Sequence, residues 1–321
     1  MIFGTYNRSM EKLKLVFAGT GDIGAEVLKA LAQDERFSIL EVITGSDKPG
    51  GRSLKLQPSP IKELALELNL PIGQPTTKSE LNTKIAQLEP DLLLVVDYGM
   101  IIPQATLHLP KVGAINIHPS LLPKHRGPTP IQTTLLNGEL KTGVSWIIMS
   151  AKMDAGPLIK QVEMVRTGQE NYQELAEKLK RIAADHTGTV LAEYAMNKES
   201  KLQDEEMATY TKKISKADGW INFDQKTADE IERMCRAYSG WPGCYFYLDN
   251  KRIKTLSVRA IEQKMYSSSV STSGGKLSIG AREGAVEIEQ LHPESKKPMT
   301  ADEFLRGVGA SSAELKLEPK P

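Results

Sequence analysis

The stretch that decides the fold is "KLKLVFAGTGDIGAEVLKALAQ", Lys12 to Gln33. Its apolar run before the first glycine is typical of a buried strand, and the apolar residues after Ile23 recur at helical spacing. Between them lies "GTGDIG", Gly19 to Gly24, which fits the G-x-G-x-x-G pattern of a dinucleotide-binding turn. Strand, glycine turn and helix together predict the first unit of a doubly wound α/β sheet.

The same glycines raise the question of whether the chain binds NAD. A dinucleotide site also needs an acidic residue roughly 20 positions further on, where it holds the ribose hydroxyls at the end of the second strand. The second predicted strand, Ser38 to Thr44, ends without one, because Glu41 lies mid-strand and Asp47 lies in the loop beyond. We therefore expect no nicotinamide cofactor, although a nicotinamide-dependent oxidoreductase stays an alternative that the glycines alone favour.

Length and composition narrow the class of protein. The chain has 321 residues, which suggests about two domains, and its net charge of +1 gives no global attraction to nucleic acid. Its two cysteines, Cys235 and Cys244, have neither zinc-site nor redox spacing, as expected in a reducing compartment. The sequence contains no apolar window approaching the roughly 20 residues of a membrane span. We expect a cytoplasmic protein with no membrane contact, no metal and no obligatory protein partner.

The pattern of the chain changes twice. Through residue 196, apolar runs alternate with helical patterns, which predicts a mostly parallel, Rossmann-like sheet. Residues 197–213 are polar and charged, as in a surface linker. From residue 214 to 321, short alternating runs are separated by Asp-Asn and Gly-Gly turns, which predicts a small C-terminal β-barrel of the oligonucleotide-binding (OB) kind.

Two polar residues mark the strand in "GAINIHPSLLPKHRGPTPI", Gly113 to Ile131. Strand alternation puts Asn116 and His118 on one face, at the carboxyl end of a central strand, where open α/β sheets bind ligands. An isolated Asn-x-His is usually a hydrogen-bonded pair with no further role. The proline-rich loop that follows is costly to order, however, and loops of this kind tend to carry function.

A carboxylate is predicted to join this pair. The strand Val144 to Met149 runs into "SAKMDAGPL", and we expect Asp154 in a loop at the same edge of the sheet, although an Asp here is most often an Asx-turn residue. Amide, imidazole and carboxylate together can run acyl transfer to an amine without a covalent intermediate. His118 and Asp154 would take the amine proton, while Asn116 and the protonated imidazole would stabilise the oxyanion.

Three segments, "VVDYGMIIP", "INIHPSLLPKHRGPTPIQ" and "MDAGP", resemble those of the folate-dependent formyltransferase family, and the resemblance runs from about Leu13 to about Leu305. The stretch Ser46 to Ala65 is similar to an insertion with which family members acting on tRNA grip the acceptor stem. Ile214 to Phe246 is similar to the start of their barrel domain. The resemblance implies transfer of the formyl group of 10-formyltetrahydrofolate to the α-amino group of methionine on initiator tRNA, in support of translation initiation.

The same resemblance assigns residues. Asn116, His118 and Asp154 would be catalytic. The folate site would be lined by two segments, with Tyr98, Gly99, Met100 and Ile101 in one and Ser120, Leu121, Leu122 and Pro123 in the other. The tRNA would meet Arg52, with Lys48 and Lys55 beside it, and also Arg126 and Gly127.

Three positions depart from the family's usual pattern. Gly21 stands where proline is usual, Asp97 replaces a small apolar residue, and Ala155 replaces a frequent threonine. Burying Asp97 without a partner would raise its pKa. Two further alternatives stay open, namely a formyltransferase for a small amine such as a sugar amine or a glycinamide nucleotide, and an inactive RNA-binding relative.

Overall fold

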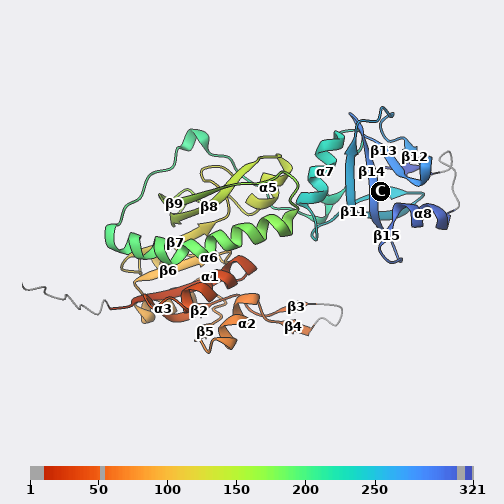
Figure 1. Cartoon of the computed structure of the whole chain (residues 1–321). Coiled ribbons are helices and arrows are strands. Elements are labelled where there is room, and N and C mark those ends of the chain that lie inside the picture. The colour runs from red at the N-terminus through yellow and green to blue at the C-terminus, as the bar shows by residue number, and fades with distance from the viewer. Residues whose placement is uncertain (1–10, 51–54, 309–314, 320–321) are drawn as a thin grey trace, which may run out of the picture. The chain divides into compact units, whose positions relative to one another are not determined.

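The computed structural model describes residues 11–50, 55–308 and 315–319. The chain forms two compact units (Figure 1). The first comprises Met1–Gly127, Thr142–Met164 and Ala176–Tyr210, and the second comprises Pro128–Lys141, Val165–Leu175 and Thr211–Pro321. Among the described residues, no helix is both long enough and apolar enough to cross a membrane.

A seven-stranded sheet with the order β5-β2-β1-β6-β7-β8-β9 forms the centre of the first unit. The five strands from β5 to β7 pair in parallel, whereas β8 runs antiparallel to β7. The prediction of a doubly wound, mostly parallel sheet is therefore confirmed. The strands are β1 (Leu13–Gly19), β2 (Phe37–Ile43), β5 (Ile72–Gly73), β6 (Leu92–Val96), β7 (Gly113–His118), β8 (Lys141–Ile148) and β9 (Leu158–Val165).

Helices cover both faces of this sheet. On one face, α3 (Lys78–Leu88) and α4 (Gln104–Leu107) contribute Leu81, Ile85 and Leu107 to a core with β1 and β6. On the other, Trp146 of β8 donates its indole N–H to Thr187 of the long helix α6 (Tyr172–Asn197), 3.0 Å away. The remaining elements of this unit are the helices α1 (Asp22–Ala32) and α2 (Pro60–Glu67) and the hairpin strands β3 (Lys48–Gly50) and β4 (Lys55–Gln57).

Local sequence signals explain where α2 begins. Ser59 precedes it, and its hydroxyl accepts a hydrogen bond from the backbone N–H of Lys62 at 3.1 Å. Pro60 occupies the first helical position, where its missing N–H costs nothing. Ser59 and Pro60 therefore set where this helix begins.

Gly19 and Gly24 of the first turn lie very close to neighbouring residues. A side chain at Gly19 would begin 2.5 Å from the carbonyl oxygen of Val96, and one at Gly24 would begin 2.7 Å from the side chain of Ile61. Both distances are shorter than van der Waals contact. Close approach of β1 to the Val96 backbone thus requires Gly19 whether or not the turn holds a phosphate, whereas at Gly24 the tip of the Ile61 side chain would have to move.

The second unit contains the predicted barrel. Its antiparallel strands are ordered β12-β13-β14-β11-β10-β16, with β15 paired to β14, and they curve into a nearly closed sheet (Figure 1). The OB-like barrel predicted from the alternating runs is confirmed. Its elements are α5 (Pro130–Leu136), α7 (Ala228–Ala237), β10 (Cys244–Leu248), β11 (Lys251–Ile261), β12 (Val270–Ser271), β13 (Leu277–Gly280), β14 (Ala285–Pro293), β15 (Met299–Thr300), α8 (Ala301–Val308) and β16 (Leu317–Glu318).

Candidate active site

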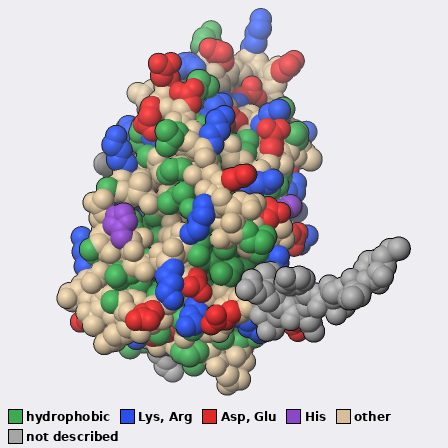
Figure 2. Space-filling view, turned by 90° about the vertical axis from the view of Figure 1, so that its left-hand side faces the viewer, with side chains coloured by type: hydrophobic (Ala, Val, Ile, Leu, Met, Phe, Trp, Pro, Cys, Tyr) green, Lys and Arg blue, Asp and Glu red, His purple; other side chains and the backbone are tan. Residues whose placement is uncertain are grey.

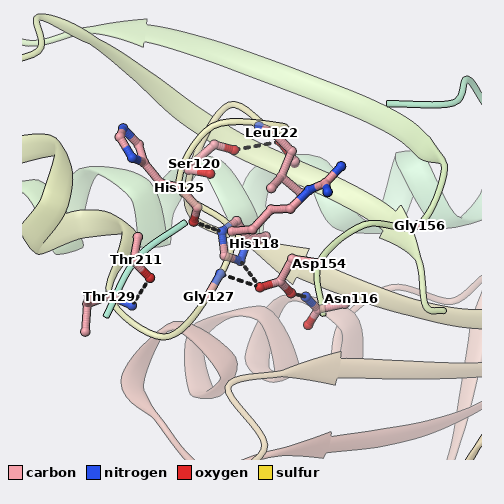
Figure 3. Close-up of polar contacts among 12 residues, drawn as sticks. Asn116, His118, Ser120, Leu122, His125, Gly127, Thr129, Asp154, Gly156 and Thr211 are labelled. Carbon is pink, nitrogen blue, oxygen red and sulfur yellow. Dashed lines mark hydrogen bonds and ion pairs between the residues drawn. The ribbon is translucent and has the colours of Figure 1, made fainter. Parts of the chain in front are cut away.

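Strand β7 presents its polar residues on a single side. Ile115 and Ile117 are buried on the other face, as the alternation predicts. Asn116 and His118 both point toward Asp154 (Figure 3). One short strand therefore supplies an amide and an imidazole to the same place.

Asp154 reaches this place by a route that differs from the expected one. Because β8 is antiparallel to β7, with Ile148 paired to Ile115, its carboxyl end lies at the amino end of β7 and not at the predicted edge. The chain then turns back along the strands. Gly156 permits the turn, since a side chain there would begin 1.7 Å from the carbonyl oxygen of Ile148. The loop thus returns Asp154 to the polar residues of β7.

The three side chains contact one another through Asp154. Its Oδ1 accepts a long hydrogen bond from Asn116 Nδ2 at 3.4 Å, and its Oδ2 lies 3.7 Å from His118 Nδ1. The backbone N–H of Gly127 donates to Oδ2 at 2.8 Å. Gly127 has φ 113°, a conformation that favours glycine, so its N–H is aimed by a residue type that the turn requires.

The tautomer of His118 follows from its other contact. Its Nε2–H donates to the carbonyl oxygen of His125 at 2.9 Å, so in the neutral ring Nδ1 carries the lone pair on the side of Asp154. Burial lowers the pKa of His118, and the nearby Asp154 carboxylate partly offsets this. The ring is therefore neutral at pH 7 and able to accept a proton at Nδ1.

Of the residues predicted to line a folate site, some are buried and others are exposed. Ser120 and Leu122 are buried, and both bond to Ser145, whose hydroxyl accepts from the Leu122 N–H at 3.1 Å and donates to the Ser120 carbonyl at 2.6 Å. Leu121 and Pro123 are half-buried. After β6, Tyr98 and Met100 pack against the core, whereas Ile101 is 73% exposed and Gly99 has open space where a side chain would start.

Two departures from the family pattern lie against each other. A side chain at Gly21 would begin 2.5 Å from Asp97 Oδ2, so a residue larger than glycine there conflicts with the carboxylate. Desolvation, and then the nearby Asp22 carboxylate, raise the pKa of Asp97. Asp22 also lies in the first turn of α1. Lys48 acts on the pKa of Asp97 in the opposite direction.

The residues predicted to meet tRNA have different surroundings. The prediction for Arg126 is not supported, because its side chain is fully buried and its guanidinium bonds to Gln203, Glu205 and Tyr210. Lys48 is exposed on β3. Arg52 lies outside the described residues, and only the backbone of Lys55 lies within them. Acidic and basic side chains are interspersed on the face in Figure 2, in keeping with the near-neutral net charge.

Sequence reasoning missed two residues that contact this site. Gln203 Nε2 donates to the carbonyl oxygens of Asp154 and Gly156 at 2.8 Å and 2.7 Å. The Thr209 hydroxyl accepts from the His125 N–H at 2.8 Å. Both residues lie in the stretch that composition marks as a linker, where no periodic pattern indicates a contact with a distant loop.

With the geometry established, the chain can be compared with known proteins. It matches the family described as formyl transferase over residues 12–194, and that family's C-terminal domain over residues 213–309. It is 38% identical to a methionyl-tRNA formyltransferase of Pseudomonas fluorescens over 79% of this chain and 80% of that protein. Identity to one of Pseudomonas savastanoi is 36%, over 92% of this chain and 95% of the relative.

A solved structure shares the fold. The N-formyltransferase from Helicobacter canadensis, in complex with folinic acid and dTDP-3-aminofucose, superposes with a TM-score of 0.66 and 18% identity. The match covers 86% of this chain and 98% of that protein.

Proposed function

Because this chain belongs to the formyl transferase family, we propose that it transfers a formyl group from a folate to the α-amino group of methionine on initiator tRNA. The observation that carries the proposal is the convergence of Asn116, His118 and Asp154 around the side of His118 that holds the lone pair. The name of the two relatives, each similar over more than three quarters of this chain, supports the substrate.

The donor is 10-formyltetrahydrofolate in this proposal. The loop that follows β6 suits a flat ring system, because Ile101 is exposed and Gly99 leaves the backbone open. The Helicobacter canadensis protein of the same fold was solved with folinic acid, itself a formylated folate. Ser120 and Leu122 are buried, so in this proposal they support the site and do not form its exposed surface.

His118 accepts and then gives up the proton, and Asp154 stabilises the imidazolium between the two steps. The amine lone pair attacks the formyl carbon, and the proton that the amine loses moves to His118 Nδ1. The imidazolium that forms lies 3.7 Å from the Asp154 carboxylate, which stabilises it. The same proton then passes to N10 of the folate as the bond from the formyl carbon to N10 breaks. The products are the formylated amine and tetrahydrofolate, and no oxidant or further reactant is needed.

Asn116 stabilises the oxyanion of the tetrahedral adduct. Its amide has two N–H groups, and the contact to Asp154 at 3.4 Å uses only one of them. The other donates to the oxygen of the tetrahedral adduct, the place where negative charge develops. Asp154 therefore positions the amide as well as the imidazole.

The tRNA is held by elements outside this group. In our proposal Arg52 and Lys48 of the insertion approach the acceptor stem, with Lys55 beside them. Arg126 has no part in tRNA binding, because its side chain is buried. Gly127 acts at the catalytic centre, where its N–H donates to Asp154.

An acceptor assay tests the proposal. The purified protein is mixed with 10-formyltetrahydrofolate and with methionyl initiator tRNA, free methionine or an amino sugar, and tetrahydrofolate release is followed. We expect release with the charged tRNA only. Release with a small amine instead would keep the chemistry and reject the tRNA, and no release with any acceptor would reject the transfer.

A further inference from the structure

A short stretch between the predicted domains contacts two loops of the first unit, the one that carries Asp154 and the one whose His125 carbonyl accepts from His118. We call Gln203 to Tyr210 the strap. It contains one turn of 3-10 helix, Glu205–Met207, and its two ends bond to different loops of the site. Gln203 binds the loop that carries Asp154, and Thr209 binds the loop that follows β7.

The Gln203 amide has its orientation fixed. Its side chain is buried, and its Oε1 accepts from Arg126 Nε at 3.1 Å and from Nη2 at 2.9 Å. A guanidinium can only donate, so the oxygen of Gln203 must face it and the NH₂ must face the carbonyls of Asp154 and Gly156. A flipped amide would place donor against donor and acceptor against acceptor. This end of the strap therefore holds the loop that carries Asp154 by two donated bonds, one to the Asp154 carbonyl and one to the Gly156 carbonyl.

Arg126 is itself held in place. Its guanidinium donates to both carboxylate oxygens of Glu205, at 2.8 Å and 3.1 Å, and to the Tyr210 hydroxyl at 3.2 Å. A bidentate pair of this kind fixes direction as well as distance. Glu205 and Tyr210 of the strap thus bond to one side of the Arg126 guanidinium, and Gln203 of the strap bonds to the other side.

The second end of the strap acts on His118. The carbonyl of His125, which accepts the Nε2–H of His118, belongs to the same planar peptide group as the N–H of Arg126. That N–H donates to the Thr209 carbonyl at 2.9 Å. The Thr209 hydroxyl also accepts from the His125 N–H at 2.8 Å. Thr209 therefore orients the peptide that selects the tautomer of His118.

From these contacts we infer that Gln203 and Thr209 are positioning residues for formyl transfer, Gln203 acting on Asp154 and Thr209 acting on His118. The inference rests on the proposed function, in which His118 carries the proton and Asp154 stabilises the imidazolium. Asp154 has φ 52°, a left-handed conformation that is unfavourable for a residue other than glycine. Such a backbone persists only where its surroundings hold it, and the Gln203 bonds do so here.

Three variants separate positioning from simple packing. Gln203→Met removes the donated bonds and the Arg126 contact at similar volume. Gln203→Glu keeps an acceptor for Arg126 but cannot donate to the two carbonyls. Thr209→Val removes only the hydroxyl. Its control is Thr187→Val in α6, which removes a buried hydroxyl that accepts from Trp146 of β8.

Kinetics give the first readout. We expect both Gln203 variants to lose on the order of 10²-fold in kcat, because displacement of a catalytic group by about 1 Å has effects of this size. The KM values for folate and tRNA should stay within about threefold, since Gln203 and Thr209 contact the loops that hold Asp154 and His118 and have no proposed contact with a substrate. Thr209→Val should lose kcat, and Thr187→Val should keep it. Wild-type kcat in Gln203→Glu would overturn the inference, because the donated bonds would then be dispensable.

A second readout uses neither substrate. The pKa of His118 is measured by NMR titration in the free protein, with His118→Gln to assign the signal. The titratable neighbours that act on it are Asp154 and His125. Because Asp154 raises the pKa of His118, retreat of the carboxylate in Gln203→Met should lower it. An unchanged titration would overturn the inference even if the chain formylates no amine, so failure of the strap and failure of the proposed function are distinguishable.

Discussion

Replacing Asp154 by asparagine tests the central electrostatic contact of the site. The variant Asp154→Asn keeps the shape of the side chain, and its amide oxygen can still accept the Gly127 N–H that Asp154 Oδ2 accepts at 2.8 Å. It removes the negative charge 3.7 Å from His118 Nδ1. We therefore expect a folded protein in which the protonated state of His118 loses its stabilisation and the Asn116 amide faces an NH₂ group in place of the carboxylate oxygen Oδ1.

The size of the effect follows from that distance. Two unit charges 3.7 Å apart attract by about 4 kcal/mol at an effective dielectric constant of about 20. Since roughly 1.4 kcal/mol corresponds to tenfold in rate, the loss amounts to about 10³-fold in kcat if the imidazolium forms before or at the transition state. The Asp154 side chain is only 16% exposed, so water screens little of this attraction.

The assay is release of tetrahydrofolate under saturating methionyl initiator tRNA, together with thermal unfolding. The control is Asp91→Asn, at a carboxylate that likewise accepts a backbone N–H, that of Lys14 at 2.8 Å, and that has no contact to His118 or Asp154. We expect full kcat in the control and unfolding temperatures within a few degrees of each other. If Asp154→Asn kept more than about a tenth of the wild-type kcat, the charge would not be what supports His118.

Three further predictions follow from the same structure. Gly156→Ala should lower the unfolding free energy by several kcal/mol, roughly the range for severe backbone clashes, because its Cβ would meet the Ile148 carbonyl at 1.7 Å, whereas Gly99→Ala, with no atom within 4 Å, should leave thermal unfolding unchanged. Gly21→Ala should displace the Asp97 carboxylate, whose Oδ2 at the end of an exposed side chain would lie 2.5 Å from the new Cβ. The loss of stability should be small, about 0.5 kcal/mol, and Asp97→Ala should relieve it in a double-mutant cycle, so additive effects would contradict the contact. Burial holds the pKa of His118 below its unfolded value of about 6.5, so the unfolded chain takes up a proton first and the unfolding free energy should fall as pH drops from about 6.5 to the folded pKa. Denaturant titrations of His118→Gln should lack this part of the slope, and an unaltered slope would refute the assignment.

Several features of the protein are determined by sequence alone. The strand, glycine turn and helix at Lys12 to Gln33, the Ser59 cap and the alternation around Asn116 and His118 are all local patterns. Backbone geometry repeats every two residues in a strand and every 3.6 in a helix, so burial of one face is written directly into neighbouring positions. The class of both units, and the pairing of an amide with an imidazole on one strand, could be predicted for this reason.

Tertiary structure decided what joins this pair. The antiparallel course of β8 and the return of its loop at Gly156 bring Asp154 to His118, although the sequence suggests a simpler route. The family resemblance assigns Arg126 to tRNA binding, yet its side chain is buried, and Gln203 and Glu205, more than 70 positions away, accept its hydrogen bonds. Contacts between such distant segments leave no periodic trace in either one. The sequence therefore determines the elements and the groups that they carry, and only the folded chain decides which distant groups satisfy one another.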